Sequence, residues 1–379
     1  MTRVRLSSSF TSLLVVLLLA VAGSRATAQE IIESEEHRFR IDTVASGLEF
    51  PWGITFLPNG DVLVTERPGR VRLVRDGALR AAPIDGGPQV RARGQGGLLD
   101  IAAHPRFAEN RFVYLTYSKP GTRGGTTALA RARFENDRLV GLEDLFVADA
   151  WSNAGQHFGS RIVFDSAGYV FFGVGDRGDR DRAQNRLDHA GTVIRLHDDG
   201  RVPTDNPFVG RRDARPEIWS YGHRNPQGMT LHPVTGELWE NEHGARGGDE
   251  INLVRPGRNY GWPLITHGIN YNGERISPDT ARAGLEQPQL HWTPSIAVSG
   301  MAIYLGDRFA GWRGNVLNGS LAGRQLRRVV FDGHRPTHQE TLLQGRMPIR
   351  QVKVGPDGDI YLLSHLREGA VLRLSPVAP

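Results

Sequence analysis

The 379-residue chain contains no cysteine, so neither disulfide bonds nor thiol chemistry contributes to its fold or activity. Lysine is almost absent: it occurs only at Lys119 and Lys353, and all other cationic side chains are arginines. The basic residues are scattered rather than gathered in a stripe, which gives no support to nucleic-acid binding. No Gly-x-Gly-x-x-Gly stretch follows a strand and opens a helix, and a Gly-x-Ser-x-Gly elbow is missing, so the sequence gives no support to a nicotinamide, flavin or elbow-serine enzyme.

Long hydrophobic runs are equally scarce. The one candidate, Leu13 to Ala22, follows Arg3 and Arg5 and precedes a small-residue cleavage pattern that ends at Ala28. A charged start, a short apolar stretch and such a pattern are typical of a secretory signal peptide. The sequence therefore predicts a signal peptide over residues 1–28 and a soluble periplasmic protein; an uncleaved anchor is the alternative.

The predicted mature part, residues 29–379, has no second apolar run long enough to span a membrane. It contains no low-complexity linker, so we expect a single domain. The formal net charge of +5 falls close to neutral when the leader, with its three arginines and no acid, is removed.

Helical periodicity of useful length is missing from the mature part. One pattern recurs instead: an apolar run, a turn rich in Gly, Pro, Asn or Asp, and a second apolar run, typical of a β-hairpin. The six copies lie at residues 51–65, 97–117, 159–174, 225–239, 298–317 and 349–363. Such self-similarity indicates an all-β fold, a six-bladed β-propeller with long inter-blade loops. We expect the ring to close by pairing Phe39–Val44 with Ala370–Leu374.

Unusual polar residues stand at comparable positions where these copies begin, namely Gln95, His157, Arg224 and Arg350. Because equivalent inner strands of a propeller meet near its axis, these side chains are predicted to converge. Taken singly, each has a plain structural explanation, such as a turn residue, a hydrogen-bonding histidine or an arginine tying loop carbonyls together. Taken together, the arginines indicate a site for an anion, since a guanidinium group binds carboxylate or phosphate through two parallel donors.

Two charged stretches attract attention. Trp239–Trp262 is predicted to be a loop that carries several acids among glycines, and oxygen ligands on such a loop suit Ca²⁺. A solvated surface loop is the other interpretation, and the residues alone leave both open. The run Gly175–Arg182 alternates in sign and is more simply a solvated, self-paired loop. The acids of the first stretch are Glu240, Glu242, Asp249 and Glu250.

Six segments carry more specific motifs: Gly94–Leu98, His157–Arg161, Gly191–Phe208, Gly222–Pro226, Glu242–Glu250 and Trp292–Ile296. With these motifs in this order, the chain resembles the soluble quinoprotein sugar dehydrogenases. These form the glucose/sorbosone dehydrogenase family, and the likeness is greatest to its periplasmic aldose-sugar dehydrogenase branch. The resemblance covers essentially the whole mature chain and implies a six-bladed propeller, in agreement with the six hairpin copies.

The resemblance also implies an activity and its site. The enzyme would oxidise the anomeric carbon of an aldose to a lactone, with pyrroloquinoline quinone and Ca²⁺ as cofactors. Hydride would pass to the quinone while a histidine base takes the hydroxyl proton and Ca²⁺ acts as a Lewis acid. The family's base falls on His157, and its quinone contacts fall on Gln95, Arg224, Asn225 and Arg350. The catalytic Ca²⁺ falls on the carbonyls of Gly244 and Ala245, and a second, structural Ca²⁺ on Glu250 and Tyr260.

Several positions depart from the family's pattern. Ala245 stands where a proline is usual, and Gln156 stands where the glucose-dehydrogenase branch has an Asp before the base, so a carboxylate to orient His157 is not evident. The family's quinone-contacting Lys falls on Ala322 and the first of its late Arg pair on Pro348. Arg324 or Arg346 is a candidate to compensate.

The partners implied are an aldose and an external electron acceptor, with no nucleic acid, and the protein is a monomer or homodimer. Two other functions remain open. A calcium-dependent propeller lactonase would need a carboxylate-rich axial site, whereas Arg, Gln and His stand at these positions. A non-catalytic binding propeller would have no reason to place His157 beside an anion site. A fold does not fix a function.

Overall fold

The computed structural model describes residues 1–2 and 30–377. The predicted signal peptide, residues 1–28, therefore lies outside the described residues except for its first two positions. Residues Ile31–Pro379 form one compact unit. Among the helices of the described residues, none combines the length and the apolar character that crossing a membrane requires.

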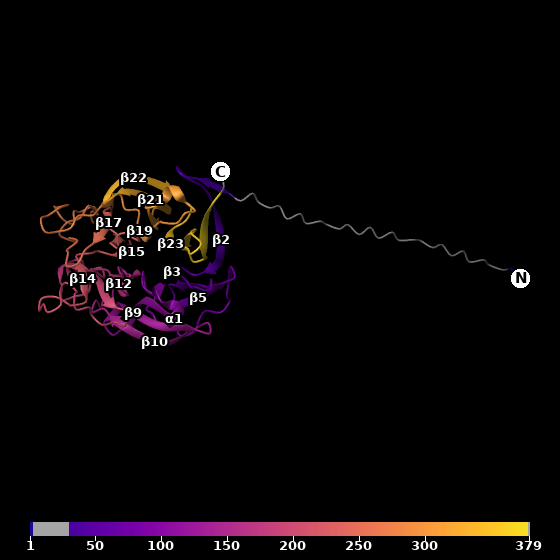
Figure 1. Cartoon of the computed structure of the whole chain (residues 1–379), viewed down its shortest axis with the longest axis horizontal. Coiled ribbons are helices and arrows are strands. Elements are labelled where there is room, and N and C mark those ends of the chain that lie inside the picture. Colours follow the sequence, from indigo (N-terminus) through magenta and orange to yellow (C-terminus); the bar gives the residue numbers. More distant parts are fainter. Residues whose placement is uncertain (3–29, 378–379) are drawn as a thin grey trace. The chain divides into compact units, whose positions relative to one another are not determined.

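Six antiparallel sheets are arranged around a central axis like the blades of a wheel, as Figure 1 shows. The first strand of each blade is the innermost one. These inner strands contact one another in a closed cycle, β3 with β7, β11, β15, β19 and β23 in turn, and β23 again with β3. The prediction of an all-β, six-bladed propeller is confirmed.

The first three blades follow one another along the chain. The first contains β3 (Pro51–Phe56), β4 (Val62–Glu66), β5 (Arg70–Arg75) and β6 (Ala78–Leu79). The second contains β7 (Leu98–Ala103), β8 (Phe112–Gly121), β9 (Gly124–Glu135) and β10 (Arg138–Val147), with the short helix α1 (Phe107–Asn110) after β7. The third contains β11 (Ile162–Phe164), β12 (Tyr169–Val174), β13 (Thr192–His197) and β14 (Ile218–Tyr221), with the 3₁₀ turn η1 (Arg180–Gln184).

The remaining blades complete the ring. The fourth contains β15 (Pro226–Leu231), β16 (Leu238–Glu242), β17 (Asp249–Val254) and β18 (Leu290–Trp292). The fifth contains β19 (Val298–Ile303), β20 (Val316–Ser320), β21 (Gln325–Asp332) and β22 (Arg335–Leu342), with the 3₁₀ turn η2 (Ala310–Trp312). The sixth contains β23 (Ile349–Val354), β24 (Ile360–Ser364), β25 (Gly369–Pro376), β2 (Arg38–Leu48) and β1 (Ile31–Glu33).

The same tight turn joins the first two strands of three blades. In the first blade the amide of Gly60 donates to the carbonyl of Leu57 at 3.0 Å, and Gly60 has a φ of +89°. Gly168 and Gly358 repeat this arrangement in the third and sixth blades, with φ of +87° and +78°. A backbone with positive φ favours glycine, which is why the turn signature recurs in the sequence.

Closure of the ring joins the two ends of the propeller. Strand β2 pairs antiparallel with β25, so that Ile41 lies opposite Leu374 and Ser46 opposite Ala370. The predicted partners Phe39–Val44 and Ala370–Leu374 are therefore confirmed. Phe39, which is fully buried, packs edge-on against Phe309 and Trp312 of the fifth blade. Burial of aromatic surface thus reinforces the backbone pairing at the closure.

The stretch Trp239–Trp262 is not the loop that the sequence suggested. Its four acids lie in β16 and β17, which pair directly, with Glu242 opposite Glu250. All five residues of β16 are buried. The acids are strand residues whose side chains point into the protein. A buried carboxylate can occupy a strand position when neighbouring groups donate hydrogen bonds to it.

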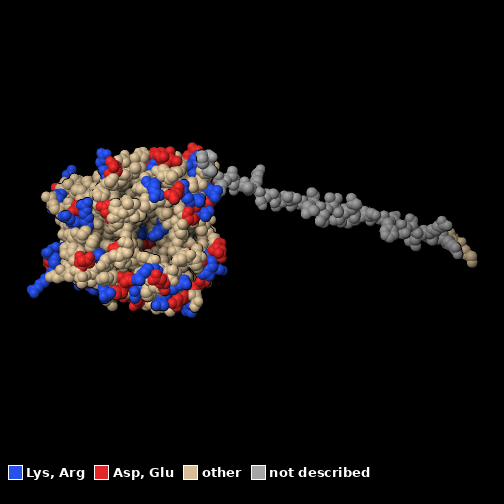
Figure 2. Space-filling model, in the orientation of Figure 1, with Lys and Arg blue, Asp and Glu red and all other residues tan. Residues whose placement is uncertain are grey.

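The inner strands all run the same way along the axis, which gives the ring two different mouths. The amino ends of the inner strands and the loops before them surround the first, called here the entry mouth. The carboxyl ends surround the second, the exit mouth. Between them Arg161 and Asp100 form a buried ion pair with 2.8 Å between Nη1 and Oδ1. Figure 2 shows one face of the ring, hollowed at its centre, with Lys and Arg atoms inside the hollow.

Candidate functional site

The predicted residues meet at the entry mouth because each lies just before, or at the start of, an inner strand. The backbone amide of His157 donates to Oε1 of Gln95 at 2.8 Å, which ties the loop before β11 to the loop before β7. The amide of Gly159 donates to Oδ1 of Asn225 at 3.2 Å, which ties it to β15 as well. Neighbouring blades thus hold the His157 loop from both sides.

His157 is oriented by a carboxylate that the sequence did not reveal. Nδ1 of His157 lies 2.6 Å from Oδ1 of Asp176, and Nε1 of Trp262 donates to the other oxygen of Asp176 at 2.8 Å. The amide of Gly178 donates to Oδ1 at 2.7 Å. The expectation that His157 lacks an orienting carboxylate is therefore wrong. Gln156, the residue before it, is exposed, and Asp176 in the loop after β12 orients the ring instead.

The surroundings of His157 favour the neutral ring. Burial lowers the pKa of His157 below its usual 6.5, and the charge of Arg224 lowers it further, against the opposing effect of Asp176. With the Nδ1 proton shared with Asp176, Nε2 carries the free electron pair. Within the described residues Nε2 makes no hydrogen bond, and the side chain is 9% exposed. This ring is prepared to accept a proton at Nε2.

Arg177 fixes the backbone of the His157 loop from below. Its guanidinium donates to the carbonyls of Gln156 and Ala154 and lies 3.5 Å from the centre of the Phe158 ring. Asp176 and Arg177 are 1% and 0% exposed. The interpretation of Gly175–Arg182 as a solvated, self-paired loop is thus wrong for its first half. The second half, from Gly178 to Asp181, is exposed as predicted.

Arg350 lies across the axis, beside a cavity of about 50 Å³ that Gln95, Gln227 and His243 also line. One Nη of Arg350 donates to Oε1 of Gln227 at 2.8 Å, while its Nε has no partner among the described residues. Burial lowers the pKa of Arg350 to about 9. A positive charge with a spare donor, held away from water, favours an anionic ligand.

Arg224 and Asn225 both rest on Glu242. The backbone amides of the two residues donate to Oε2 of Glu242, at 2.5 and 3.0 Å. The guanidinium of Arg224 donates to the carbonyls of His243 and Gly244. Nε of Arg224 and Nδ2 of Asn225 are buried and have no partner in the described part of the chain. Both side chains therefore have an unused donor, as Arg350 does.

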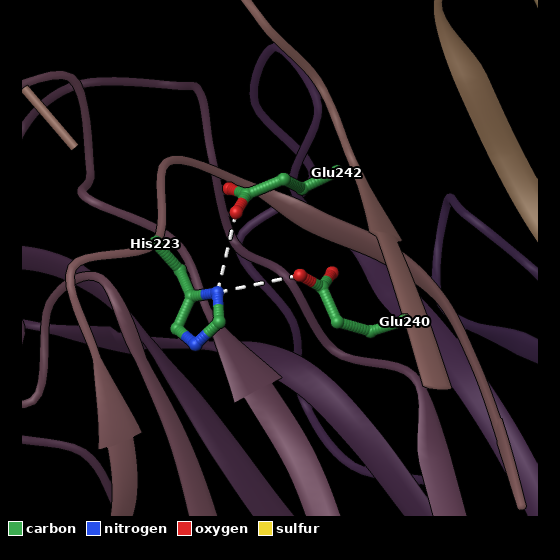
Figure 3. Close-up of side chains that lie close together, drawn as sticks. All are labelled: His223, Glu240 and Glu242. Carbon is green, nitrogen blue, oxygen red and sulfur yellow. Dashed lines mark hydrogen bonds and ion pairs between the residues drawn. The ribbon is translucent and has the colours of Figure 1, made fainter. Parts of the chain in front are cut away.

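A buried carboxylate cluster supports this arrangement from behind, and Figure 3 shows its centre. Nδ1 of His223 lies 3.3 Å from Glu240 and 3.2 Å from Glu242, and the three side chains have metal-ligand spacing. Burial alone would lower the pKa of His223, but the two carboxylates outweigh it and raise the pKa to about 9. Glu240 and Glu242 thus bind a cationic histidine, and Glu242 also positions the backbone of Arg224.

The residues predicted to hold Ca²⁺ lie around one small cavity of about 10 Å³, lined by Arg224, Gly244, Glu250 and Tyr260 among others. Asp249 stabilises the turn, since its Oδ1 accepts the amide of Gly244 at 2.9 Å. Ala245, also predicted, is buried beside it. The hydroxyl of Tyr260 is committed to the carbonyl of Leu253 at 2.6 Å, and Nδ2 of Asn252 donates to Glu250 at 3.2 Å.

The departures from the family's pattern lie at the edge of this site. Ala322 is exposed, next to Leu321, which lines the axial cavity. Arg324 is exposed and donates to the carbonyl of Arg346 at 3.1 Å. The carbonyl of Pro348 accepts the amide of His365 at 2.8 Å. The Arg324 guanidinium is therefore hydrogen-bonded to the loop before β23.

Known proteins are similar to this chain in sequence and in fold. A family model for Glucose / Sorbosone dehydrogenase matches residues 48–373. Aldose sugar dehydrogenase YliI of Escherichia coli (strain K12) is 42% identical over 343 residues, which cover 89% of this chain and 92% of that protein. The crystal structure of the soluble aldose sugar dehydrogenase from Escherichia coli in the apo-form has a TM-score of 0.87 and 40% identity, covering 89% of this chain and 100% of that one.

A further solved structure, the PQQ-bound form of aldose sugar dehydrogenase from Streptomyces coelicolor, has a TM-score of 0.75. It is 27% identical, and the match covers 89% of this chain and 98% of that one. The family model spans most of the propeller, from the end of β2 to β25. The chain therefore belongs to the glucose/sorbosone dehydrogenase family.

Proposed function

We propose that this protein is a periplasmic aldose dehydrogenase that uses pyrroloquinoline quinone and Ca²⁺ and oxidises the anomeric carbon of a sugar to a lactone. The observation that carries the proposal is the pair His157–Asp176 at the entry mouth, surrounded by arginines with unused donors. A general base beside an anion site is what hydride transfer from a sugar to a quinone that carries carboxylates requires. Electrons then pass to an external acceptor.

His157 is the base in this proposal. Its neutral ring accepts the proton of the anomeric hydroxyl at Nε2, while Asp176 holds the ring by Nδ1 and stabilises the imidazolium that forms. Trp262 and Gly178 hold Asp176 in turn, so the pair cannot rotate freely. Burial excludes bulk water, which keeps the base neutral at pH 7.

The residues at the mouth fit an anionic quinone. Arg224, Asn225 and Arg350 each have a buried donor without a partner in the described part of the chain, and Gln95 lines the axial cavity together with Arg350. Carboxylates of the quinone would complete these hydrogen bonds. Arg224 lines the smaller cavity and Arg350 and Gln95 the larger one, so these side chains would hold the quinone between them.

The fit to Ca²⁺ involves an exchange of partners. The carbonyl of Gly244, a predicted ligand with that of Ala245, accepts a hydrogen bond from the cationic Arg224. A carbonyl that attracts one cation can bind another. Ca²⁺ at this carbonyl would need Arg224 to give up that bond, which would free a guanidinium donor for a quinone carboxylate. Bound Ca²⁺ would supply Lewis-acid polarisation of the hydride-accepting carbonyl. Glu250 and Tyr260 are proposed for the structural Ca²⁺.

The lactonase alternative receives no comparable support. None of the residues that line the axial cavity is acidic, whereas a calcium hydrolase would present carboxylates there. The deciding experiment mixes the purified protein with Ca²⁺ and pyrroloquinoline quinone and follows dye reduction over a panel of aldoses. Lactone hydrolysis is measured in parallel. Dye reduction that needs both additions and is lost in His157→Ala supports the proposal; hydrolysis without dye reduction contradicts it.

A further inference from the structure

A second cavity lies at the exit mouth, at the opposite end of the channel from His157. It measures about 430 Å³ and is formed by the carboxyl ends of the six inner strands. The Arg161–Asp100 ion pair and the Arg350–Gln227 hydrogen bond lie between it and the entry mouth. It is therefore separate from the proposed dehydrogenase site, and nothing in that proposal uses it.

Lys353 on β23 gives this cavity an uncompensated positive charge. It lines the cavity and is accessible to solvent along the channel, yet it forms no hydrogen bond or ion pair with any described residue. The other lysine of the chain, Lys119, pairs with Asp144 at 2.5 Å. Enclosure by protein lowers the pKa of Lys353, and the nearby Arg161 lowers it further, although Asp100 opposes this. The Lys353 ammonium is thus a solvent-accessible charge that has no counter-ion among the described residues.

The neighbouring charges do not provide one. Asp100, whose charge acts on Lys353, already has partners. Its Oδ1 accepts a hydrogen bond from Arg161 at 2.8 Å, and its Oδ2 accepts one from the amide of Ile162 at 2.9 Å. Nη2 of Arg161 is buried and has no partner in the described residues. The centre of the channel therefore carries three cations, Arg161, Arg350 and Lys353, for the one acid Asp100, and Lys353 is the one that lines the open cavity without a partner among the described residues.

The wall around this charge combines polar groups, such as Thr55, Thr230 and Gln351, with aliphatic side chains. Val163, Leu231 and Val354 line the cavity and are only half-buried, so their side chains still present apolar surface. Met229 and Met301 line it as well, and methionine adapts to ligands of varied shape. A concave wall with aliphatic side chains and a few converging polar groups, here including Lys353 and Arg161, is typical of a small-molecule site.

We propose that the exit mouth binds a small organic carboxylate, whose carboxylate group pairs with the ammonium of Lys353 and whose apolar part packs on Val163, Leu231 and Val354. The charge of Arg161 adds attraction, and the three aliphatic side chains distinguish such a ligand from inorganic phosphate, which would gain only the charge. The chain would thus carry a second anion site that faces away from the sugar.

The two lysines allow a direct test. Reductive methylation with ¹³C-labelled formaldehyde keeps the lysine charge and gives one dimethyl NMR signal each for Lys119 and Lys353, assigned with Lys119→Met and Lys353→Met. Hexanoate should move the Lys353 signal to saturation and leave Lys119 unmoved. Acetate should bind at least about tenfold more weakly, because it buries fewer methylene groups. Hexanol and phosphate should cause little shift.

Three results would overturn the proposal: no saturable shift of Lys353 with hexanoate, equal responses to phosphate and hexanoate, or parallel movement of both lysines. Calorimetry on the unmodified protein provides the second measurement, with hexanoate heat lost in Lys353→Met and kept in Lys119→Met. Lys353→Met should fold, since it replaces an unpaired charge by an apolar side chain of similar length, and should keep sugar oxidation unchanged. Retained hexanoate heat in Lys353→Met would also contradict the site.

Discussion

Asp176 holds His157 by a 2.6 Å contact between its Oδ1 and the ring Nδ1, although the two residues stand 19 positions apart and on different loops. The pairing brings the loop before β11 and the loop after β12 together at the entry mouth. It fixes which nitrogen of the ring carries the proton, and hence which nitrogen faces the mouth as a base.

Replacing Asp176 should therefore impair the proposed base without removing it. In Asp176→Asn we expect kcat to fall by about 10²–10⁴, since an amide no longer enforces the tautomer or stabilises the imidazolium. The sugar KM should change much less. Steady-state dye reduction measures both constants. Asp179→Asn is the matched control, because Asp179 is exposed in the same charged run and should keep full activity. A normal kcat in Asp176→Asn would remove Asp176 from the mechanism.

The pH dependence of kcat/KM follows from the pKa of His157. Burial lowers this pKa below 6.5, so the ring loses its proton, and the base becomes available, as pH rises through that lower value. The acid limb of the profile should thus have its midpoint below 6.5, with a plateau toward neutral pH. Because Asp176 raises the pKa, the limb of Asp176→Asn should move to still lower pH. An acid limb centred above pH 7 would argue against His157 as the base.

Arg350 is predicted to act on cofactor binding rather than on protein stability. Its spare donor and buried charge would bind the anionic quinone, so Arg350→Gln should raise the quinone dissociation constant by about 10- to 100-fold. Titration of the apoenzyme with quinone, followed by dye reduction, gives this constant. Arg324→Gln serves for comparison, because Arg324 is exposed and bonded to the Arg346 carbonyl. Equal affinity loss in both variants would contradict the placement.

Ring closure should depend on the aromatic contact between β2 and the fifth blade. Phe39→Ala removes a fully buried ring from β2 and leaves a cavity beside Trp312, which we expect to cost about 3–5 kcal/mol of unfolding free energy. Ile31→Ala on β1 should cost less than about 0.5 kcal/mol, since Ile31 is 43% exposed. Denaturant unfolding followed by tryptophan fluorescence measures the difference. Similar midpoints for the two variants would show that closure does not rely on this packing.

The repeated pattern of the sequence was enough to predict the blades and the closure. Turn glycines such as Gly60 and alternating apolar runs are local features, and a local feature can be recognised without knowing its partners. The convergence of Gln95 and His157 followed from the repeat as well. The sequence did not reveal those pairs of interacting residues that only the fold brings together. Asp176 looked like one of several charges in a solvated run, because nothing in its own segment indicates that His157 lies above it.

The acids of β16 were misread for a related reason. A strand normally alternates apolar and polar residues, and Glu240 and Glu242 broke the apolar pattern, so the segment resembled a loop. Their burial is stabilised by His223, which is 17 and 19 positions earlier in the chain. Burying carboxylates is tolerable only where a cation and donors meet them, and only the fold brings those groups together.

The central claim is that His157 removes a proton from a sugar held at the entry mouth while pyrroloquinoline quinone accepts the hydride. The most direct measurement is the rate of dye reduction by the wild-type protein and by His157→Ala, each loaded with quinone and Ca²⁺ and supplied with an aldose panel. The account predicts activity in the wild type with at least one aldose, and in His157→Ala unchanged quinone binding with a rate lower by about 10²-fold or more. Silence of the loaded wild type across the panel, or full activity in His157→Ala, would contradict it.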